Sequence, residues 1–219
     1  MIWSRILDIF RAAQPKPDLP NIEIVDRRKF AAQRHHGYPV RSRSLTKVTG
    51  VCLHQTACNM GSRPERYDGT GSHVVVAGRK VIWLHDWTHR VVAANGWNDA
   101  TVSIEVNGLY AGIEGDQRTV WDDPSTPTRE QASSLSEETA QATREVLRWM
   151  KRTIPNLNVV VAHRQASGDR RNDPGEAIWK RVAIPARDEL GLVTPDGFTM
   201  SDGLRIPEAW DPRCKGVKY

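Results

Sequence analysis

Two histidines and one aspartate occupy positions where a protein can bind a metal ion. His54 ends a run of alternating apolar residues that predicts a strand, and His163 follows a strand predicted from consecutive valines. Asp173 lies further on, in a loop, and Pro174 biases its backbone towards extended geometry, which holds the carboxylate in place. Two imidazoles and a carboxylate leave the fourth position of a tetrahedral zinc ion open for water, as in catalytic rather than structural zinc sites.

Two further side chains would supply the remaining groups of a hydrolytic site. Glu105 lies on the polar face of a strand predicted over residues 101–106, where a carboxylate is disfavoured by propensity and therefore indicates a function. It could orient and deprotonate water, while Arg171 could direct its guanidinium at the oxyanion formed on a carbonyl. This set predicts zinc-dependent hydrolysis of an amide or ester. Each residue alone has a structural alternative: a packed histidine, a salt-bridged carboxylate or an Asp-Pro-Gly turn.

The elements around these residues follow the α/β pattern. A hairpin is expected around residues 78–80, and a long amphipathic helix should begin at residues 128–131 and precede the strand at residues 159–161. A second amphipathic helix is expected over residues 176–190, where Pro185 should kink or interrupt it.

Residues 1–45 are interpreted as an N-terminal basic extension and linker, with a short strand at residues 22–25. Residues 1–50 carry ten Lys or Arg against four Asp or Glu, while the whole chain has a formal net charge of +5. Such an arm suits a polyanionic partner, although no nucleic-acid-binding motif accompanies it and a solvated surface explains most of the charges. Apolar positions among residues 2–10 predict a helix docked on the body, with membrane-surface binding as the alternative.

The sequence shows neither a membrane span nor a signal peptide, because no apolar run is long enough and Arg5, Asp8 and Arg11 interrupt the apolar N-terminus. Residues 46–190 are interpreted as the catalytic domain. Residues 191–219 are interpreted as a tail packed on that domain, with Phe198 and Trp210 as its anchors.

The cysteines and one histidine pair give secondary expectations. The odd number of cysteines, without a CxxC spacing, argues against a disulfide framework. Cys52 should be buried in its strand, and Cys58 is an alternative metal ligand because it follows His54 closely. The paired histidines at residues 35–36 are expected in an exposed loop.

Four stretches, in order along the chain, resemble motifs of the type-2 N-acetylmuramoyl-L-alanine amidases. This family includes bacterial cell-wall amidases, phage endolysins and animal peptidoglycan recognition proteins. Residues 53–57 (LHQTA) are similar to the first-ligand motif, and residues 71–86 to the Ser-x-His hairpin, with Gly in place of Ser. Residues 98–108 resemble the stretch that carries the family's glutamate, and residues 163–175 the His…Lys-x-Asp-Pro-Gly stretch. The resemblance covers roughly residues 46–190.

The resemblance implies a central mixed β-sheet flanked by helices and a Zn²⁺ ion held by His54, His163 and Asp173, with Glu105 as base or electrostatic partner. The implied substrate is the amide between the lactyl group of N-acetylmuramic acid and the L-alanine of the stem peptide, in peptidoglycan or muropeptides. Substrate contacts are expected at four residues: His73, Asn95, Trp97 and Asn98.

Three departures from the family pattern bear on mechanism and specificity. Arg171 stands where the family has Lys; it keeps the charge but cannot lose its proton, so a stabilising role survives and a proton-donor role does not. Residues 92–97 lack the family's histidine, so Asn95 or Trp97 would take over contact with sugar or peptide. Ala162 replaces the Gly that precedes the second ligand.

The main hypothesis is a zinc amidase that lyses cell walls as an endolysin does, made in the cytoplasm and acting on the wall after another factor releases it. Two alternatives stay open. One is a cytosolic amidase that recycles soluble (anhydro)muropeptides; the other is a non-catalytic peptidoglycan-binding module, which loss of a metal ligand would indicate. We expect a monomer that does not bind nucleic acid.

Overall fold

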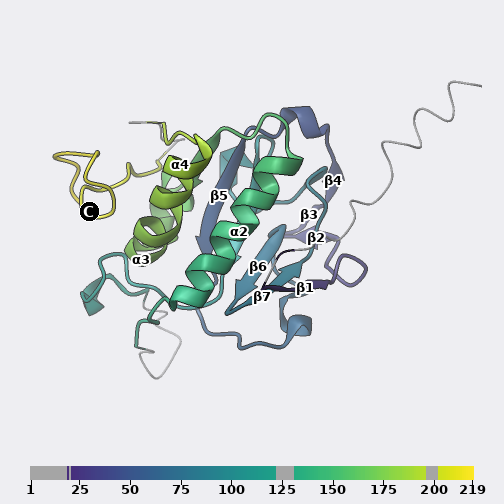
Figure 1. The fold of residues 1–219 in the computed structure, drawn as a ribbon, viewed down its shortest axis with the longest axis horizontal. Helices are drawn as coiled ribbons and strands as arrows, with labels where there is room; N and C mark the ends of the chain where they lie inside the picture. Colours follow the sequence, from purple (N-terminus) through teal and green to yellow (C-terminus); the bar gives the residue numbers. More distant parts are fainter. Residues whose placement is uncertain (1–18, 20, 122–130, 196–201) are drawn as a thin grey trace, which may run out of the picture.

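The computed structural model describes residues 19, 21–121, 131–195 and 202–219, and a six-stranded sheet forms the centre of the fold (Figure 1). The strands lie in the spatial order β1 (Glu23–Asp26), β7 (Lys80–Trp83), β6 (Val74–Ala77), β9 (Thr101–Val106), β5 (Gly50–Gln55) and β10 (Val159–Ala162). The strands β6, β9, β5 and β10 are parallel to one another, whereas β7 is antiparallel to β6. This mixed sheet confirms the predicted α/β class and the predicted hairpin.

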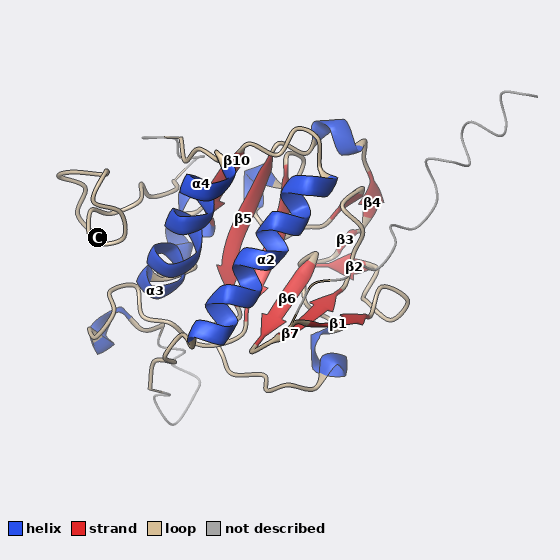
Figure 2. Ribbon diagram, viewed as in Figure 1, coloured by secondary structure: helices blue, strands red, loops and turns tan. Residues whose placement is uncertain are grey.

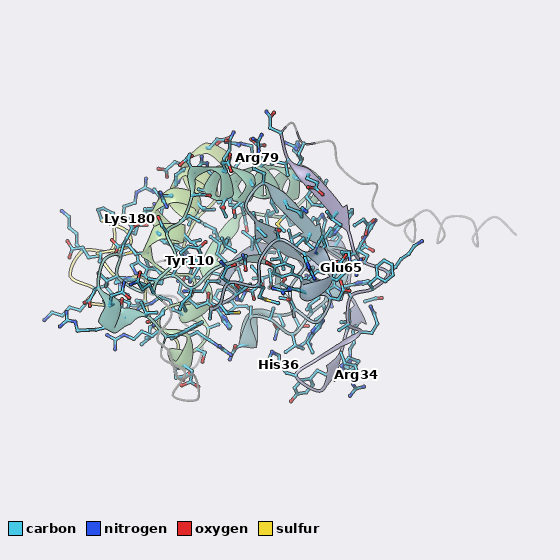
Figure 3. All side chains as sticks on the ribbon, turned by 90° about the horizontal axis from the view of Figure 1, so that it is seen from below. Arg34, His36, Glu65, Arg79, Tyr110 and Lys180 are labelled. Atoms are coloured by element: carbon cyan, nitrogen blue, oxygen red, sulfur yellow. The ribbon has the colours of Figure 1, made fainter. Side chains whose placement is uncertain are left out.

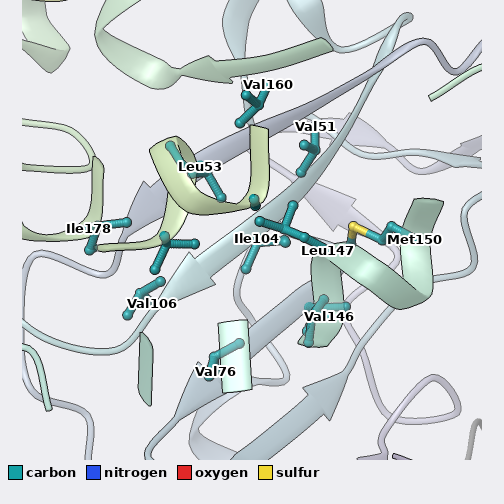
Figure 4. Packing of buried hydrophobic residues seen from close by; sticks show 14 of the residues in the cluster. Val51, Leu53, Val76, Ile104, Val106, Val146, Leu147, Met150, Val160 and Ile178 are labelled. Carbon is teal, nitrogen blue, oxygen red and sulfur yellow. The ribbon is translucent and has the colours of Figure 1, made fainter. Parts of the chain in front are cut away.

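Three helical segments cover one face of the sheet (Figure 2). They are α2 (Glu137–Thr153), α3 (Glu176–Ile178) and α4 (Ile184–Leu190), with the π-helical segment η7 (Trp179–Ala183) joining the last two. Apolar residues of β5 and β9, such as Leu53 and Ile104, pack here in one core with Leu147 of α2 (Figure 4). Because successive strand residues face opposite ways, His54 and Glu105 must lie on the other face.

The first long helix begins later than its sequence pattern suggested. Residues 131–136 are not helical, and α2 starts at Glu137 because the hydroxyl of Ser136 accepts a hydrogen bond from the Thr139 N–H (3.2 Å). The prediction of a start at residues 128–131 was therefore wrong at residue 131, and residues 128–130 lie outside the described residues. Serine is a favoured N-cap, and two glutamates in the first turn complement the helix dipole.

The second predicted helix spans residues 176–190 without a break. Pro185 sits in the first turn of α4, where its missing N–H is tolerated, and the widened π-helical turn lies just before it. Pro185 therefore does not break the helix, and the predicted irregularity is the π-helical turn that precedes it. Gly191 ends the helix in the left-handed conformation.

Short elements lie around the sheet. The extended ones are β2 (Arg34–His35), β3 (Tyr38–Pro39), β4 (Arg41–Ser42) and β8 (His89–Arg90). The 3-10 helices are η1 (Leu45–Lys47), η2 (Pro64–Tyr67), η3 (Asn95–Trp97), η4 (Gln117–Thr119), η5 (His163–Gln165) and η6 (Gly168–Arg170). β2 pairs with β3, and β4 pairs with β8, in two small antiparallel sheets.

The segment before β5 is more structured than a linker. The strand expected near residues 22–25 is β1, which joins the central sheet beside β7. His36 is exposed on the β2–β3 hairpin, near Arg34 (Figure 3), but His35 is buried, with its Nε2 atom 3.2 Å from Nε2 of His85. The exposed-loop prediction was therefore wrong for His35. The helix expected over residues 2–10 lies outside the described residues.

The tail after residue 202 packs on the body through Trp210, which is fully buried and donates a hydrogen bond to the carbonyl of Gly112. This confirms Trp210 as an anchor, while Phe198 lies outside the described residues. Cys52 is buried as expected, Cys58 is exposed, and none of the three cysteines, all of which the structure describes, forms a disulfide. Among the helices that the structure describes, none combines the length and the apolar character needed to cross a bilayer.

Candidate active site

The carboxyl ends of three neighbouring parallel strands place the predicted site residues together. His54 on β5 lies directly beside Glu105 on β9 in the strand register, and Leu53 lies beside Ala162, the last residue of β10. His163 follows immediately as the first residue of η5. Open α/β sheets present ligands at the carboxyl ends of their strands, so the sheet alone accounts for the meeting of residues more than a hundred positions apart.

His54, His163 and Asp173 form a compact ligand set. The Nδ1 atoms of the two histidines are 2.9 Å apart, and Oδ2 of Asp173 lies 2.9 Å from His163 Nδ1 and 3.7 Å from His54 Nδ1. In a tetrahedral zinc site, bonds of about 2.0–2.1 Å place neighbouring ligand atoms roughly 3.3 Å apart. The three atoms therefore have the spacing and the chemistry of a zinc ligand set, and all three residues are buried.

Gln55 orients the carboxylate of Asp173. The second carboxylate oxygen of Asp173 accepts a hydrogen bond from the main-chain N–H of Gln55 (2.9 Å). The Gln55 side chain donates to the carbonyls of Asn172 (2.7 Å) and Pro174 (3.2 Å), on either side of Asp173. Gln55 is thus a positioning residue that the sequence analysis missed, although it follows His54 directly.

The exposed residue Asn95 orients the second histidine. Its Oδ1 atom lies 2.9 Å from Nε2 of His163. In the tautomer with the proton on Nε2, this N–H donates a hydrogen bond to Asn95 Oδ1. The lone pair of Nδ1 then faces His54 and Asp173. Hydrogen bonds of this kind fix the tautomer of metal-binding histidines. Asn95, expected as a substrate contact, therefore has a second role beside the ligand set.

The pKa shifts of His54 and Asp173 favour the forms that bind metal. Burial, with the neighbouring His163, lowers the pKa of His54 to about 4, so its imidazole is neutral near pH 7. Burial raises the pKa of Asp173, but the neighbouring His163 and His54 outweigh this effect and hold that pKa at about 2. Neutral imidazole and ionised carboxylate are the forms that coordinate zinc.

Glu105 contributes a carboxyl group with one oxygen that is unpartnered within the described residues. Its Oε2 atom is buried and makes no hydrogen bond within the described part of the chain. Burial, and then the charge of Asp173, raise the pKa of Glu105 well above its usual 4.5. A carboxyl group that holds a proton more readily than usual suits proton transfer near neutral pH.

Arg170 and Arg171, the two arginines shortly before Asp173, lie in different surroundings. Arg171, the predicted cation, donates a hydrogen bond from its guanidinium to the main-chain oxygen of Tyr219 (2.7 Å) and lies 4.5 Å from the centre of that ring. The charge of Arg170, in contrast, lowers the pKa of both Glu105 and His54. Arg170 is therefore a cation near the site that spacing alone did not single out.

The other expected substrate contacts lie at different depths. His73 is fully buried; its Nδ1 atom accepts from the Ser103 N–H (3.1 Å), and its Nε2 atom lies 2.9 Å from the carbonyl of His89. Asn98 is also buried, and its Oδ1 atom accepts from the N–H groups of residues 93 and 94, so it shapes the loop that carries Asn95. Trp97 is half-buried next to this loop. Among these residues, Asn95 and Trp97 have surface available for a ligand.

An α/β sheet with a His-His-Asp set at its strand ends defines a protein with a candidate catalytic metal site. A sequence profile described as N-acetylmuramoyl-L-alanine amidase matches residues 44–176. The chain therefore belongs to this amidase family, and its predicted resemblance to the family is confirmed. No curated protein sequence matches it.

Solved structures share the fold at low sequence identity. The Ph2119 endolysin from Thermus scotoductus MAT2119 bacteriophage Ph2119 matches with a TM-score of 0.52 and 15% identity, over 78% of this chain and 100% of that one. Bumblebee PGRP-SA matches with a TM-score of 0.51 and 16% identity, over 80% and 99% of the two chains. Drosophila peptidoglycan recognition protein SD matches with a TM-score of 0.50 and 18% identity, over 84% and 99%. These likenesses confirm the amidase and recognition-protein fold.

Proposed function

We propose that this protein is a zinc-dependent N-acetylmuramoyl-L-alanine amidase that cleaves the bond between N-acetylmuramic acid and L-alanine in peptidoglycan. The observation that carries the proposal is the buried His54–His163–Asp173 set, whose ligand atoms lie 2.9–3.7 Å apart. Family membership supplies the substrate class. A non-catalytic binding module is less well supported because the described site retains all three ligand residues and adds a carboxyl group, with one buried oxygen, beside His54.

Each residue of the site has a proposed task in this hydrolysis. Bound zinc would polarise the scissile carbonyl and lower the pKa of water. Glu105 takes a proton from the attacking water and returns it to the leaving amine of L-alanine. A cation stabilises the oxyanion that forms on the lactyl carbonyl. Because the guanidinium of Arg171 is held by Tyr219, we assign this task to Arg170 and keep Arg171 as the alternative.

The biological role that we propose is lysis of the cell wall, as in an endolysin, after another factor releases the protein from the cytoplasm. The substrate would be intact peptidoglycan, bound by a monomer, with Asn95 and Trp97 at the edge of the site. A recycling enzyme would instead act on soluble muropeptides in the cytosol.

The test compares purified sacculi with soluble anhydro-muropeptides as substrates. Hydrolysis of this amide frees the amine of L-alanine without producing new reducing sugar ends. We expect amine release from sacculi at a rate at least comparable to that from soluble fragments. Release from soluble fragments alone would assign the protein to recycling, and the appearance of reducing ends would contradict amide hydrolysis.

A further inference from the structure

A pocket separate from the candidate metal site lies between the tail and the segment that links His163 to Asp173. None of the three metal-site residues lines it. Its volume is about 490 Å³, and the tail forms much of its wall. Four cationic side chains line it, those of Arg164, Arg171, Arg205 and Lys218, together with Tyr219. The tail lies outside the part of the chain that matches the amidase family, so this pocket is a feature added to the family domain.

Arg164 forms the buried part of this pocket and has no acidic partner among the described residues. The side chain is 1% exposed, and its guanidinium lies between the rings of Trp210 (4.8 Å) and Tyr219 (5.3 Å). One of its terminal nitrogens donates to the carbonyl of Arg171 (2.8 Å), and its Nε atom makes no hydrogen bond in the described part of the chain. Burial lowers the pKa of Arg164 to about 10, so the group stays cationic at neutral pH.

The other cations of the pocket add to this charge without neutralising it. Within the described residues, no Asp or Glu side chain forms an ion pair with Arg164, Arg171, Arg205 or Lys218. The buried Arg187, in contrast, pairs with Asp211 at 2.6 Å. A buried cation without an acidic side chain beside it is costly, and cations that line one cavity repel one another. An anion in the pocket would relieve both effects.

We propose that this pocket binds a phosphate group. The guanidinium forks of arginine match the oxygens of phosphate in paired hydrogen bonds, and one phosphate group offers more acceptor oxygens than a carboxylate. The ligand is either a small phosphorylated molecule or one unit of a phosphodiester polymer, and both present anionic phosphoryl oxygens to the guanidinium groups. This assignment does not depend on the proposed amidase activity.

The binding test uses variants of exposed cations that the fold does not need. Calorimetric titration with inorganic phosphate and with pyrophosphate would compare the wild type with the double variant Arg205→Gln/Lys218→Gln. We expect at least a tenfold loss of affinity in the double variant and less than a twofold change in Lys215→Gln, an exposed tail cation outside the pocket. The affinity of the metal site for phosphate would be the same in all three proteins. The difference in affinity between them therefore reports on the pocket alone.

Two results would overturn the proposal: unchanged affinity in the double variant, or an equal loss in Lys215→Gln, which would indicate diffuse attraction by the basic surface. Thermal unfolding of each variant checks that the fold is intact.

Two further calorimetric titrations identify the kind of molecule that carries the phosphate. They use a short glycerol-phosphate polymer and, as a control, polyglutamate of equal charge. Tighter binding of the polymer than of pyrophosphate, lost in the double variant, would identify a phosphodiester polymer as the ligand. Tighter binding of pyrophosphate would identify a small phosphorylated molecule. Polyglutamate bound as tightly as the polymer, with the same loss in the variant, would contradict selectivity for phosphate.

Discussion

Replacing Glu105 with glutamine tests the chemistry of the site without removing a ligand. Glutamine has nearly the same shape as glutamate but cannot accept a proton from water. Proton transfer by a positioned side chain contributes about 10²–10⁴ in rate, or roughly 2.7–5.4 kcal/mol of transition-state stabilisation. We therefore expect kcat of Glu105→Gln to fall by this factor. Because Oε2 of Glu105 is buried and unpartnered among the described residues, loss of the charge should not lower the free energy of unfolding.

The assay measures amine release from sacculi, zinc content by atomic absorption and thermal unfolding on the same preparation. Ser103→Ala is the matched control, because Ser103 lies two residues earlier on the same face of β9 and is also a polar residue with little exposure to solvent. The control should keep wild-type turnover. If Glu105→Gln keeps kcat within about threefold of the wild type at equal zinc content, the proton-transfer role is refuted.

Three further predictions follow from the surroundings of the site. Asn95→Ala removes the hydrogen-bond partner of His163 and should weaken zinc binding by about 10–100-fold in competition with a chelator; unchanged affinity would remove Asn95 from the metal site. Arg170→Gln should lower kcat by about tenfold or more, and Arg171→Gln by less, in steady-state assays; the reverse order would restore Arg171 as the oxyanion partner. Burial and His35 hold the pKa of His85 at about 3, so the folded state binds fewer protons than the unfolded state between pH 6.5 and about 3. Stability from this group is complete above pH 6.5 and falls by up to about 1.4 kcal/mol per pH unit below it. Urea unfolding at pH 6 and pH 5 should show a shallower decline in His85→Gln, and an equal slope would contradict the assignment.

The ligand set and the sheet could be predicted from the sequence because each depends on local pattern. Alternating apolar residues before His54 and a valine run before His163 indicate strands, and parallel strands bring their carboxyl ends together. The position of Glu105 beside His54 follows from the strand register, which the alternation of polar and apolar residues on β9 already limits to one face.

Other parts of the site depend on tertiary contacts that no local pattern contains. The direction of the Arg171 side chain is set by Tyr219 of the tail, 48 positions away, while Arg170 lies 5.9 Å from the ring of Trp121. His35 contacts His85, which lies 50 positions further along the chain. The polar, basic sequence around the histidine pair at residues 35–36 therefore gave no indication that His35 is buried. The start of α2 was missed because a good N-cap, Ser136, outweighs a helical pattern that extends further upstream.

The central claim is that His54, His163 and Asp173 hold a zinc ion that hydrolysis requires. Zinc content and amine release from sacculi should be measured together on wild-type protein, on chelator-treated protein and on His163→Ala. We predict about one zinc per chain in the wild type, loss of both zinc and amine release in the other two samples, and recovery of the chelated wild type alone when zinc is returned. Full amine release from zinc-free wild type, or from His163→Ala, would contradict the account.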